Sequence, residues 1–235
     1  VFGQFDIKRI FPVMSCGIAE VLKCGIIYAC TGLFSMFLLT CIPNSKIHSD
    51  NKNVLKMKVR NIFMEFLSLA KQRCSVRKYK TDEIEKEKLD KILEAARIAP
   101  TAANAQSQRL LVISSQEAKE KLSKGVNYHG APLAIIVCGD HSDVFVRPFD
   151  KKDMVSVDAT IVADHIVLEA EDLGLSSCWL TYFDPEIIRN EFNIPSNLEP
   201  IAIIALGYAD TEKASPDRHS KDRKALESLV CYETF

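Results

Sequence analysis

Two apolar runs of strand length constrain the fold of this 235-residue chain more than any other feature. Residues 132–138 read PLAIIVC and residues 200–208 read PIAIIALGY, and neither run contains a charged side chain. Such runs, without a polar residue at every second position, are typical of strands that are buried on both faces. We therefore expect two central strands of a sheet, with further elements packed against each side of it.

The remaining pattern alternates short strands with amphipathic helices. Strands are expected at 109–114 and 176–181. Capping residues at 81–85 precede a helix that presents Leu89, Ile92, Leu93 and Ala96 on one face and ends before Pro100. Shorter helices are expected at 64–70, 116–124 and 185–191, the last capped by Asp184.

The longest helical signal runs from Asp153 to Leu173, with Gly174 as its C-cap. Its apolar residues extend beyond one stripe, so the helix must be buried on more than one side, as an interface between two subunits would achieve. His165 and Glu169 lie one turn apart. Two such residues without a third are usually structural, and we expect no metal site here.

Composition limits the class of protein. Apolar residues make up 47% of the chain and charged residues 26%, as in ordinary folded proteins. The net charge of −1 divides into +5 for residues 1–63 (eight basic, three acidic) and −6 for the remainder (22 basic, 28 acidic). An acidic body argues against nucleic acid as a partner. The eight cysteines show no metal-binding spacing, and we interpret them as reduced intracellular thiols.

Residues 24–43 form a segment of twenty residues without a charge, long enough to span a bilayer. Three interpretations stay open for this N-terminal extension, residues 1–63. It is a membrane anchor with the following domain in the cytoplasm, a cleaved signal with an imperfect lipobox at 38–41, or an upstream extension absent from a working protein that starts at Met64. In each case residues 64–235 form the folded domain.

The first chemically informative stretch is residues 73–77, RCSVR. In an extended chain, side chains at alternate positions share a face, so Arg73, Ser75 and Arg77 would point the same way. Two guanidinium forks beside a hydroxyl make a suitable receptor for a phosphate group. The alternative is a solvated basic patch.

Two further stretches carry polar groups without an obvious structural role. Residues 100–106, PTAANAQ, form a small amide-bearing loop that is able to approach a flat heteroaromatic ring, although it also suits an ordinary connection. In the polar tail, Lys221 and Arg223 alternate, so both can face one anion, unless they belong to a solvated charge run. Beyond them, the five apolar side chains between Leu226 and Phe235 are able to pack against another apolar surface, such as that of a neighbouring subunit.

Together these stretches resemble the FMN-dependent nitroreductase family over about residues 64–235. The resemblance rests on five motifs in order: Arg73-x-Ser75-x-Arg77; APTAAN-x-Q at 99–106; Ala131-Pro132; DLGLSSCW at 172–179; and Lys221-x-Arg223-Lys224-x-Leu226. Each motif alone is weak, and the ordered set is specific.

The resemblance implies an α+β three-layer fold, with a central mixed or antiparallel sheet flanked by helices, in an intertwined homodimer. It implies FMN between the subunits, with the phosphate held by Arg73, Ser75, Arg77, Lys221 and Arg223. By the same likeness, Thr101, Ala102 and Asn104 approach the flavin from the partner subunit. Leu180 and Thr181 lie near flavin N5, although many relatives have Gly or Glu where this chain has Thr181-Tyr182.

The implied activity is ping-pong hydride transfer from NADH or NADPH through FMN to small electrophiles such as nitroaromatics or quinones. Because the flavin carries the chemistry, no protein acid, base or nucleophile is nominated. Alternatives are another reaction on the same flavin, such as reductive dehalogenation, enone reduction or flavin fragmentation, or a non-catalytic flavin-binding protein. We expect a cytoplasmic protein, attached to a membrane only if 24–43 is an anchor.

Overall fold

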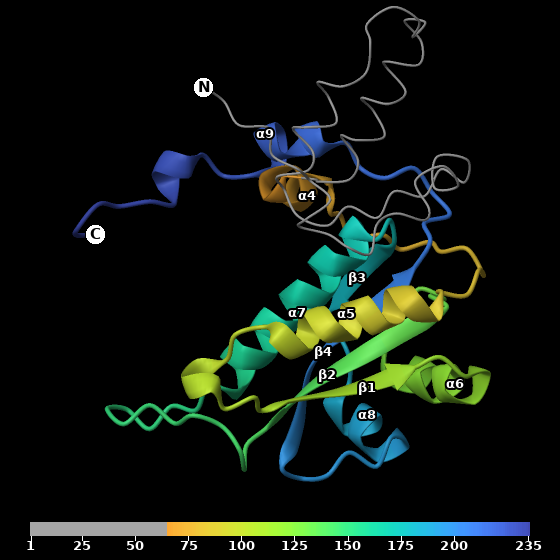
Figure 1. The fold of residues 1–235 in the computed structure, drawn as a ribbon, viewed down its shortest axis with the longest axis horizontal. Helices are drawn as coiled ribbons and strands as arrows, with labels where there is room; N and C mark the ends of the chain where they lie inside the picture. Colours follow the sequence, from red (N-terminus) through yellow and green to blue (C-terminus); the bar gives the residue numbers. More distant parts are fainter. Residues whose placement is uncertain (1–64) are drawn as a thin grey trace, which may run out of the picture. The chain divides into compact units, whose positions relative to one another are not determined.

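The computed structural model describes residues 65–235 (Figure 1). They form three layers, of which the middle one is a four-stranded sheet. The strands are β1 (Gln108–Ile113), β2 (Leu133–Asp140), β3 (Ser176–Leu180) and β4 (Leu198–Gly207). Their order is β1-β2-β4-β3, and every neighbouring pair is antiparallel. The expected α+β architecture with a central sheet is confirmed, and its named strands are all antiparallel.

The two apolar runs are the two central strands, as predicted. All eight residues of β2 are buried, and so are the last six of β4. Alternate residues of β2 enter two different cores: Ile135 and Val137 pack with α5 and α7, whereas Ile136 and Cys138 pack with α6 and α8. Burial of each large side chain contributes about 1.5–3 kcal/mol, so these strands anchor both layers.

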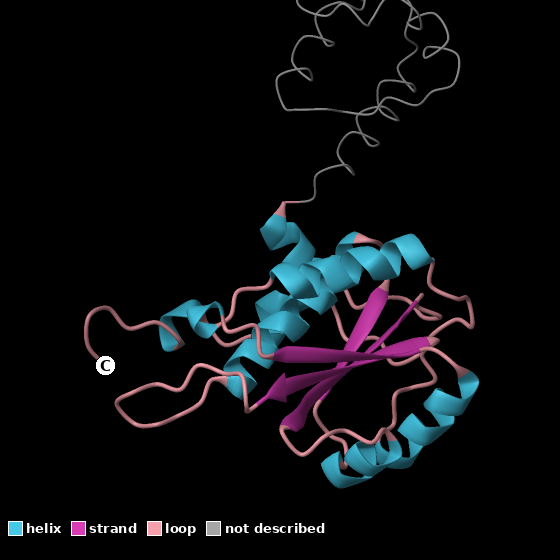
Figure 2. Cartoon of the chain, turned by 60° about the horizontal axis from the view of Figure 1, so that its bottom comes forward, coloured by secondary structure: helices cyan, strands magenta, loops and turns pink. Residues whose placement is uncertain are grey.

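Helices cover the sheet on both faces (Figure 2). α5 (Lys86–Ile98) and α7 (Val155–Asp172) lie on one face, and α6 (Gln116–Gly125) and α8 (Pro185–Glu191) on the other. Asp184 caps α8 by accepting hydrogen bonds from two backbone N–H groups at 3.0 Å. α4 (Phe66–Gln72) and α9 (His219–Asp222) are short helices with no buried residue.

The predicted capping residues at 81–85 do not cap α5. The helix begins at Lys86, and its N-cap residue Glu85 makes no side-chain capping bond. The preceding chain stays extended because Tyr79 pairs with Ala209 beyond the end of β4, and the Lys80 N–H donates to the Tyr208 carbonyl at 2.9 Å.

No helix within residues 65–235 is long and apolar enough to cross a membrane. The apolar segment 24–43, and with it the question of the N-terminal extension 1–63, lies outside the described residues.

An ionic cluster ties the end of β2 to the beginning of α7 and to β4. His141 Nδ1 lies 3.0 Å from Asp153 Oδ2, and its Nε2 lies 2.8 Å from Glu199 Oε2. A neutral imidazole has one N–H, so donation to both carboxylates requires the protonated ring. The hydrogen bond with Glu199 raises the pKa of His141 above its ordinary value; the bond with Asp153 adds to this, and partial burial opposes it.

We predict that His141→Gln destabilises the fold more in acid than in base. A pKa raised by folding contributes stability that is complete below the unfolded value of about 6.5. That contribution is lost as pH rises through the higher folded pKa. Chemical unfolding measured between pH 5 and 9 should therefore show that the difference in free energy of unfolding between wild type and His141→Gln decreases as pH increases.

His129 supplies a control of opposite sign, because burial and the charge of Arg77 lower the pKa of His129. A lowered pKa disfavours the folded state once the histidine becomes protonated. The free energy of unfolding of wild type, compared with that of His129→Gln, should therefore decrease as pH falls. If the difference in free energy of unfolding between wild type and His141→Gln stays constant from pH 5 to 9, the protonation of His141 does not contribute to the stability of the fold.

Candidate functional site

Residues 73–77 form an extended run beside the free edge of β3. Ser75 forms a parallel bridge with Ser177, and the Val76 N–H donates to the Ser177 carbonyl at 3.0 Å. Cys74 and Val76 are buried, whereas Ser75 and Arg77 are exposed and Arg73 is half-buried. The alternation predicted for this run is present: the two arginines and the serine share the face that points away from the core.

Cys178 of β3 is buried beside this run and packs in one cluster with Cys74 and Val76. Burial raises the pKa of Cys178, while the charges of Arg77 and Arg73 and a hydrogen bond with Ser75 oppose that rise. Within residues 65–235, neither arginine has a carboxylate within ion-pair distance. The patch has hydrogen-bond donors available for an anion.

The C-terminal tail is fastened to the beginning of this run. Arg218 donates to the backbone carbonyls of Arg73 at 2.7 Å and Lys71 at 3.2 Å. His219 Nε2 lies 3.1 Å from the same Lys71 carbonyl, and Arg223 Nε lies 3.4 Å from His219 Nδ1. Since a carbonyl only accepts, His219 carries its proton on Nε2, and Nδ1 accepts from Arg223.

Arg223 is therefore linked through His219 to the backbone just before Arg73. Lys221 is exposed in α9, the short helix that follows Arg218. A second contact fastens the tail before Arg218. The ammonium group of Lys213 lies 2.9 Å from both oxygens of the buried Glu171 carboxylate, near the end of α7.

Thr101, Ala102 and Asn104 lie elsewhere in the chain. They belong to the loop after α5 that contains the short helix η2 (Ala102–Asn104). In Figure 1 this loop follows the end of α5 that lies away from α4. The loop contacts Asp158 in the first turn of α7, whereas Ser75 pairs with Ser177 beyond the last turn of that 18-residue helix, which is about 27 Å long. One copy of the chain does not bring Asn104 to Arg73.

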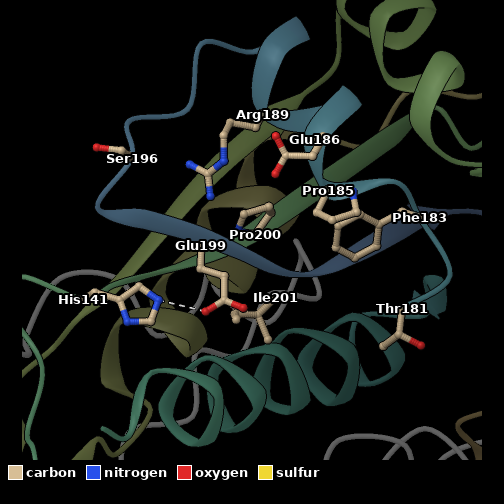
Figure 3. A pocket seen from close by; sticks show the side chains of 10 residues that line it. All are labelled: His141, Thr181, Phe183, Pro185, Glu186, Arg189, Ser196, Glu199, Pro200 and Ile201. Carbon is tan, nitrogen blue, oxygen red and sulfur yellow. Dashed lines mark hydrogen bonds and ion pairs between the residues drawn. The ribbon is translucent and has the colours of Figure 1, made fainter.

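Leu180 and Thr181 end β3 at the other predicted part of the site. Leu180 is half-buried and packs against the core. Thr181 is exposed and lines a pocket of about 460 Å³, together with Phe183, the first residue of α8 (Pro185) and the beginning of β4 (Figure 3). His141 and Glu199 form another wall of this pocket.

Sequence reasoning did not single out Arg218, His219 or Asp158. The first two stood within the polar tail, but nothing local indicates that they reach carbonyl groups about 145 residues earlier. Asp158, in the first turn of α7, accepts a hydrogen bond from the Ala102 N–H at 2.9 Å. A carboxylate in an apolar helical stretch was the available signal.

Known proteins with similar sequences share this architecture. The sequence profile of the nitroreductase family matches residues 70–127 and 123–208. A nitroreductase family protein of Clostridium difficile 630 is 52% identical in sequence, with a TM-score of 0.72 over 73% of this chain and all of that chain. The solved structure of an FMN-dependent nitroreductase from C. difficile R20291 is 36% identical with a TM-score of 0.59, over 71% of this chain and 98% of that chain.

A relative from Methanothermobacter thermautotrophicus, provisionally named NADH dehydrogenase/NAD(P)H nitroreductase, is 34% identical over 172 residues, which are 70% of this chain and 87% of the relative. The three-layer fold, the ordered motifs and these similarities agree. This chain belongs to the nitroreductase family.

Proposed function

We propose that this chain is an FMN-dependent NAD(P)H oxidoreductase of the nitroreductase type. The observation that carries the proposal is the arginine patch, in which Arg73, Ser75 and Arg77 share one face without a carboxylate partner among the described residues. The names of relatives agree with it, since they include an FMN-dependent nitroreductase and, in Bacillus subtilis, an FMN reductase that uses NAD(P)H.

The donor set fits the phosphate end of FMN. Guanidinium groups bind phosphate oxygens in pairs, and charge-assisted hydrogen bonds are the strongest of this type. Arg73 and Arg77 would hold the phosphate with the Ser75 hydroxyl between them. Lys221 and Arg223 would supply two further positive charges to the phosphate. Arg218 and His219 support this by holding the tail at the backbone where the patch begins.

The ring of the flavin would lie between the end of β3 and the loop after α5. Leu180 and Thr181 would form one side, and Thr101, Ala102 and Asn104 the other. One copy of the chain does not bring this loop to the patch, which supports a site that takes the loop from a second copy. We therefore propose an intertwined homodimer with FMN at the interface.

When bound, FMN supplies hydride transfer from NADH or NADPH to a small electrophile such as a nitroaromatic or a quinone. The residues of this chain hold the phosphate, orient the ring and leave an open face beside Thr181 for the two substrates. We assign the protein to the cytoplasm, in keeping with the four free cysteines of the described residues.

Arg73→Ala and Arg223→Ala should each weaken FMN binding. Each removes a charge-assisted hydrogen bond worth about 1.5–3 kcal/mol, which corresponds to about a 10- to 150-fold rise in Kd. Flavin fluorescence titration measures this rise. Riboflavin, which lacks the phosphate, should bind to wild type and variants alike.

Lys121→Ala is the matched control, because Lys121 is a basic residue of α6 that pairs with Glu117 away from the patch. It should leave the Kd for FMN unchanged. If both arginine variants retain the FMN affinity of Lys121→Ala, the phosphate assignment is wrong.

The C-terminal residues provide a separate test of the dimer. Leu226, Tyr232 and Phe235 are 69%, 87% and 114% exposed within one chain, which is unfavourable for apolar groups unless a partner covers them. A chain ending at Lys224 keeps every proposed phosphate ligand. We expect it to sediment as a monomer and to lose FMN, whereas the full chain sediments as a flavin-containing dimer. A dimer with full FMN occupancy after truncation would exclude a role for these residues.

A further inference from the structure

The loop after α5 has a backbone conformation that its residues do not adopt readily. Ala103, Asn104 and Gln106 have φ angles of 52°, 53° and 55°. This left-handed region is unfavourable for residues with a Cβ atom, and here it occurs three times within four residues without a glycine. Such a conformation persists only where the surroundings impose it.

Hydrogen bonds within the loop close it on itself. The Gln106 N–H donates to Thr101 Oγ1 at 3.0 Å, and the Asn104 N–H donates to the Thr101 carbonyl at 3.0 Å. Arg109, at the beginning of β1, donates to the Gln106 carbonyl at 3.0 Å. These bonds join residues close in sequence and do not fix the loop against the helical layer.

Asp158 makes that connection. Its Oδ1 accepts from the Ala102 N–H at 2.9 Å, across 56 residues of sequence. The side chain is 1% exposed, and Oδ2 has no hydrogen-bond partner among the described residues. Burying a carboxylate is costly unless its oxygens are satisfied, although the first turn of a helix favours negative charge. The hydrogen bond to this loop is therefore the contact that distinguishes Asp158 from an apolar residue at the same place.

We infer that Asp158 is a positioning residue for the flavin site. By fixing the Ala102 N–H it holds the left-handed turn in the orientation that presents Asn104, exposed at the tip of the loop, to the flavin of the second copy. This inference rests on the proposed function. Asp158 itself touches the loop and acts on the flavin only through it.

Two variants remove the hydrogen bond from opposite sides. Asp158→Ala removes the acceptor, and Ala102→Pro removes the donor N–H while leaving the carboxylate in place. Proline suits Ala102, the first residue of η2, because Thr101 before it is already extended. Asp158→Asn keeps an oxygen acceptor and should rescue the loop. Asp164→Ala, which removes an exposed carboxylate from the same helix, is the control.

Asp158→Ala and Ala102→Pro should each raise the Kd for FMN by about tenfold, the loss of one charge-assisted hydrogen bond. Asp158→Asn and Asp164→Ala should stay near the wild-type value. Since Asp158 acts through the loop, adding Asp158→Ala to the double variant Thr101→Ala/Asn104→Ala should raise the Kd for FMN by less than it does in wild type. The unfolding midpoint of each variant is measured alongside.

A purely structural role makes a different prediction. Asp158→Ala and Ala102→Pro would then lower the unfolding midpoint but leave the Kd for FMN unchanged, and this result would overturn the inference. An undiminished effect of Asp158→Ala in the Thr101→Ala/Asn104→Ala background would also overturn it, because it would mean independent action. Wild-type protein that binds no FMN would overturn the proposed function itself, whereas FMN binding by wild type and Asp158→Ala alike refutes only the role of Asp158.

Discussion

The candidate site depends on the pairing of residues 73–77 with the free edge of β3. The bond from the Val76 N–H to the Ser177 carbonyl fixes the run as an extra extended segment beside the sheet. Once that register is set, the period of two sends Cys74 and Val76 into the core and turns Arg73, Ser75 and Arg77 outward together. A shift of one residue would bury the arginines and expose the apolar side chains.

A second set of contacts brings the end of the chain to the same place. Lys213 is held by the buried Glu171 at the end of α7, and Arg218 then reaches the carbonyls of Lys71 and Arg73. These contacts fasten the tail, which carries Lys221 and Arg223, to the backbone at the beginning of the run 73–77. Arg73 and Arg77 lie side by side without an ion pair among the described residues, which is unfavourable by itself and becomes favourable when an anion binds.

Much of the fold could be predicted because buried positions require apolar residues, so the order of apolar residues in the sequence indicates which segments are buried. The continuous apolar runs indicated β2 and β4, and the alternation in RCSVR indicated the orientation of Arg73 and Arg77. The beginning of α5 could not be predicted, since the pairing of Tyr79 with Ala209, a tertiary contact, keeps the preceding chain extended. The same applies to Arg218 and Asp158, whose partners are distant backbone groups that carry no side-chain signal.

The central claim is that the arginine patch of one copy and the loop after α5 of another meet at one flavin. Mixing two defective variants, Arg73→Ala/Arg77→Ala and Thr101→Ala/Asn104→Ala, tests it most directly. If the two parts come from different subunits, a mixed dimer combines both defects in one site and leaves the other site intact. Refolding the variants together should then restore FMN binding and NAD(P)H oxidation to about half of the sites in each mixed dimer. No restoration, with mixed dimers demonstrated by differently tagged chains, would contradict the claim.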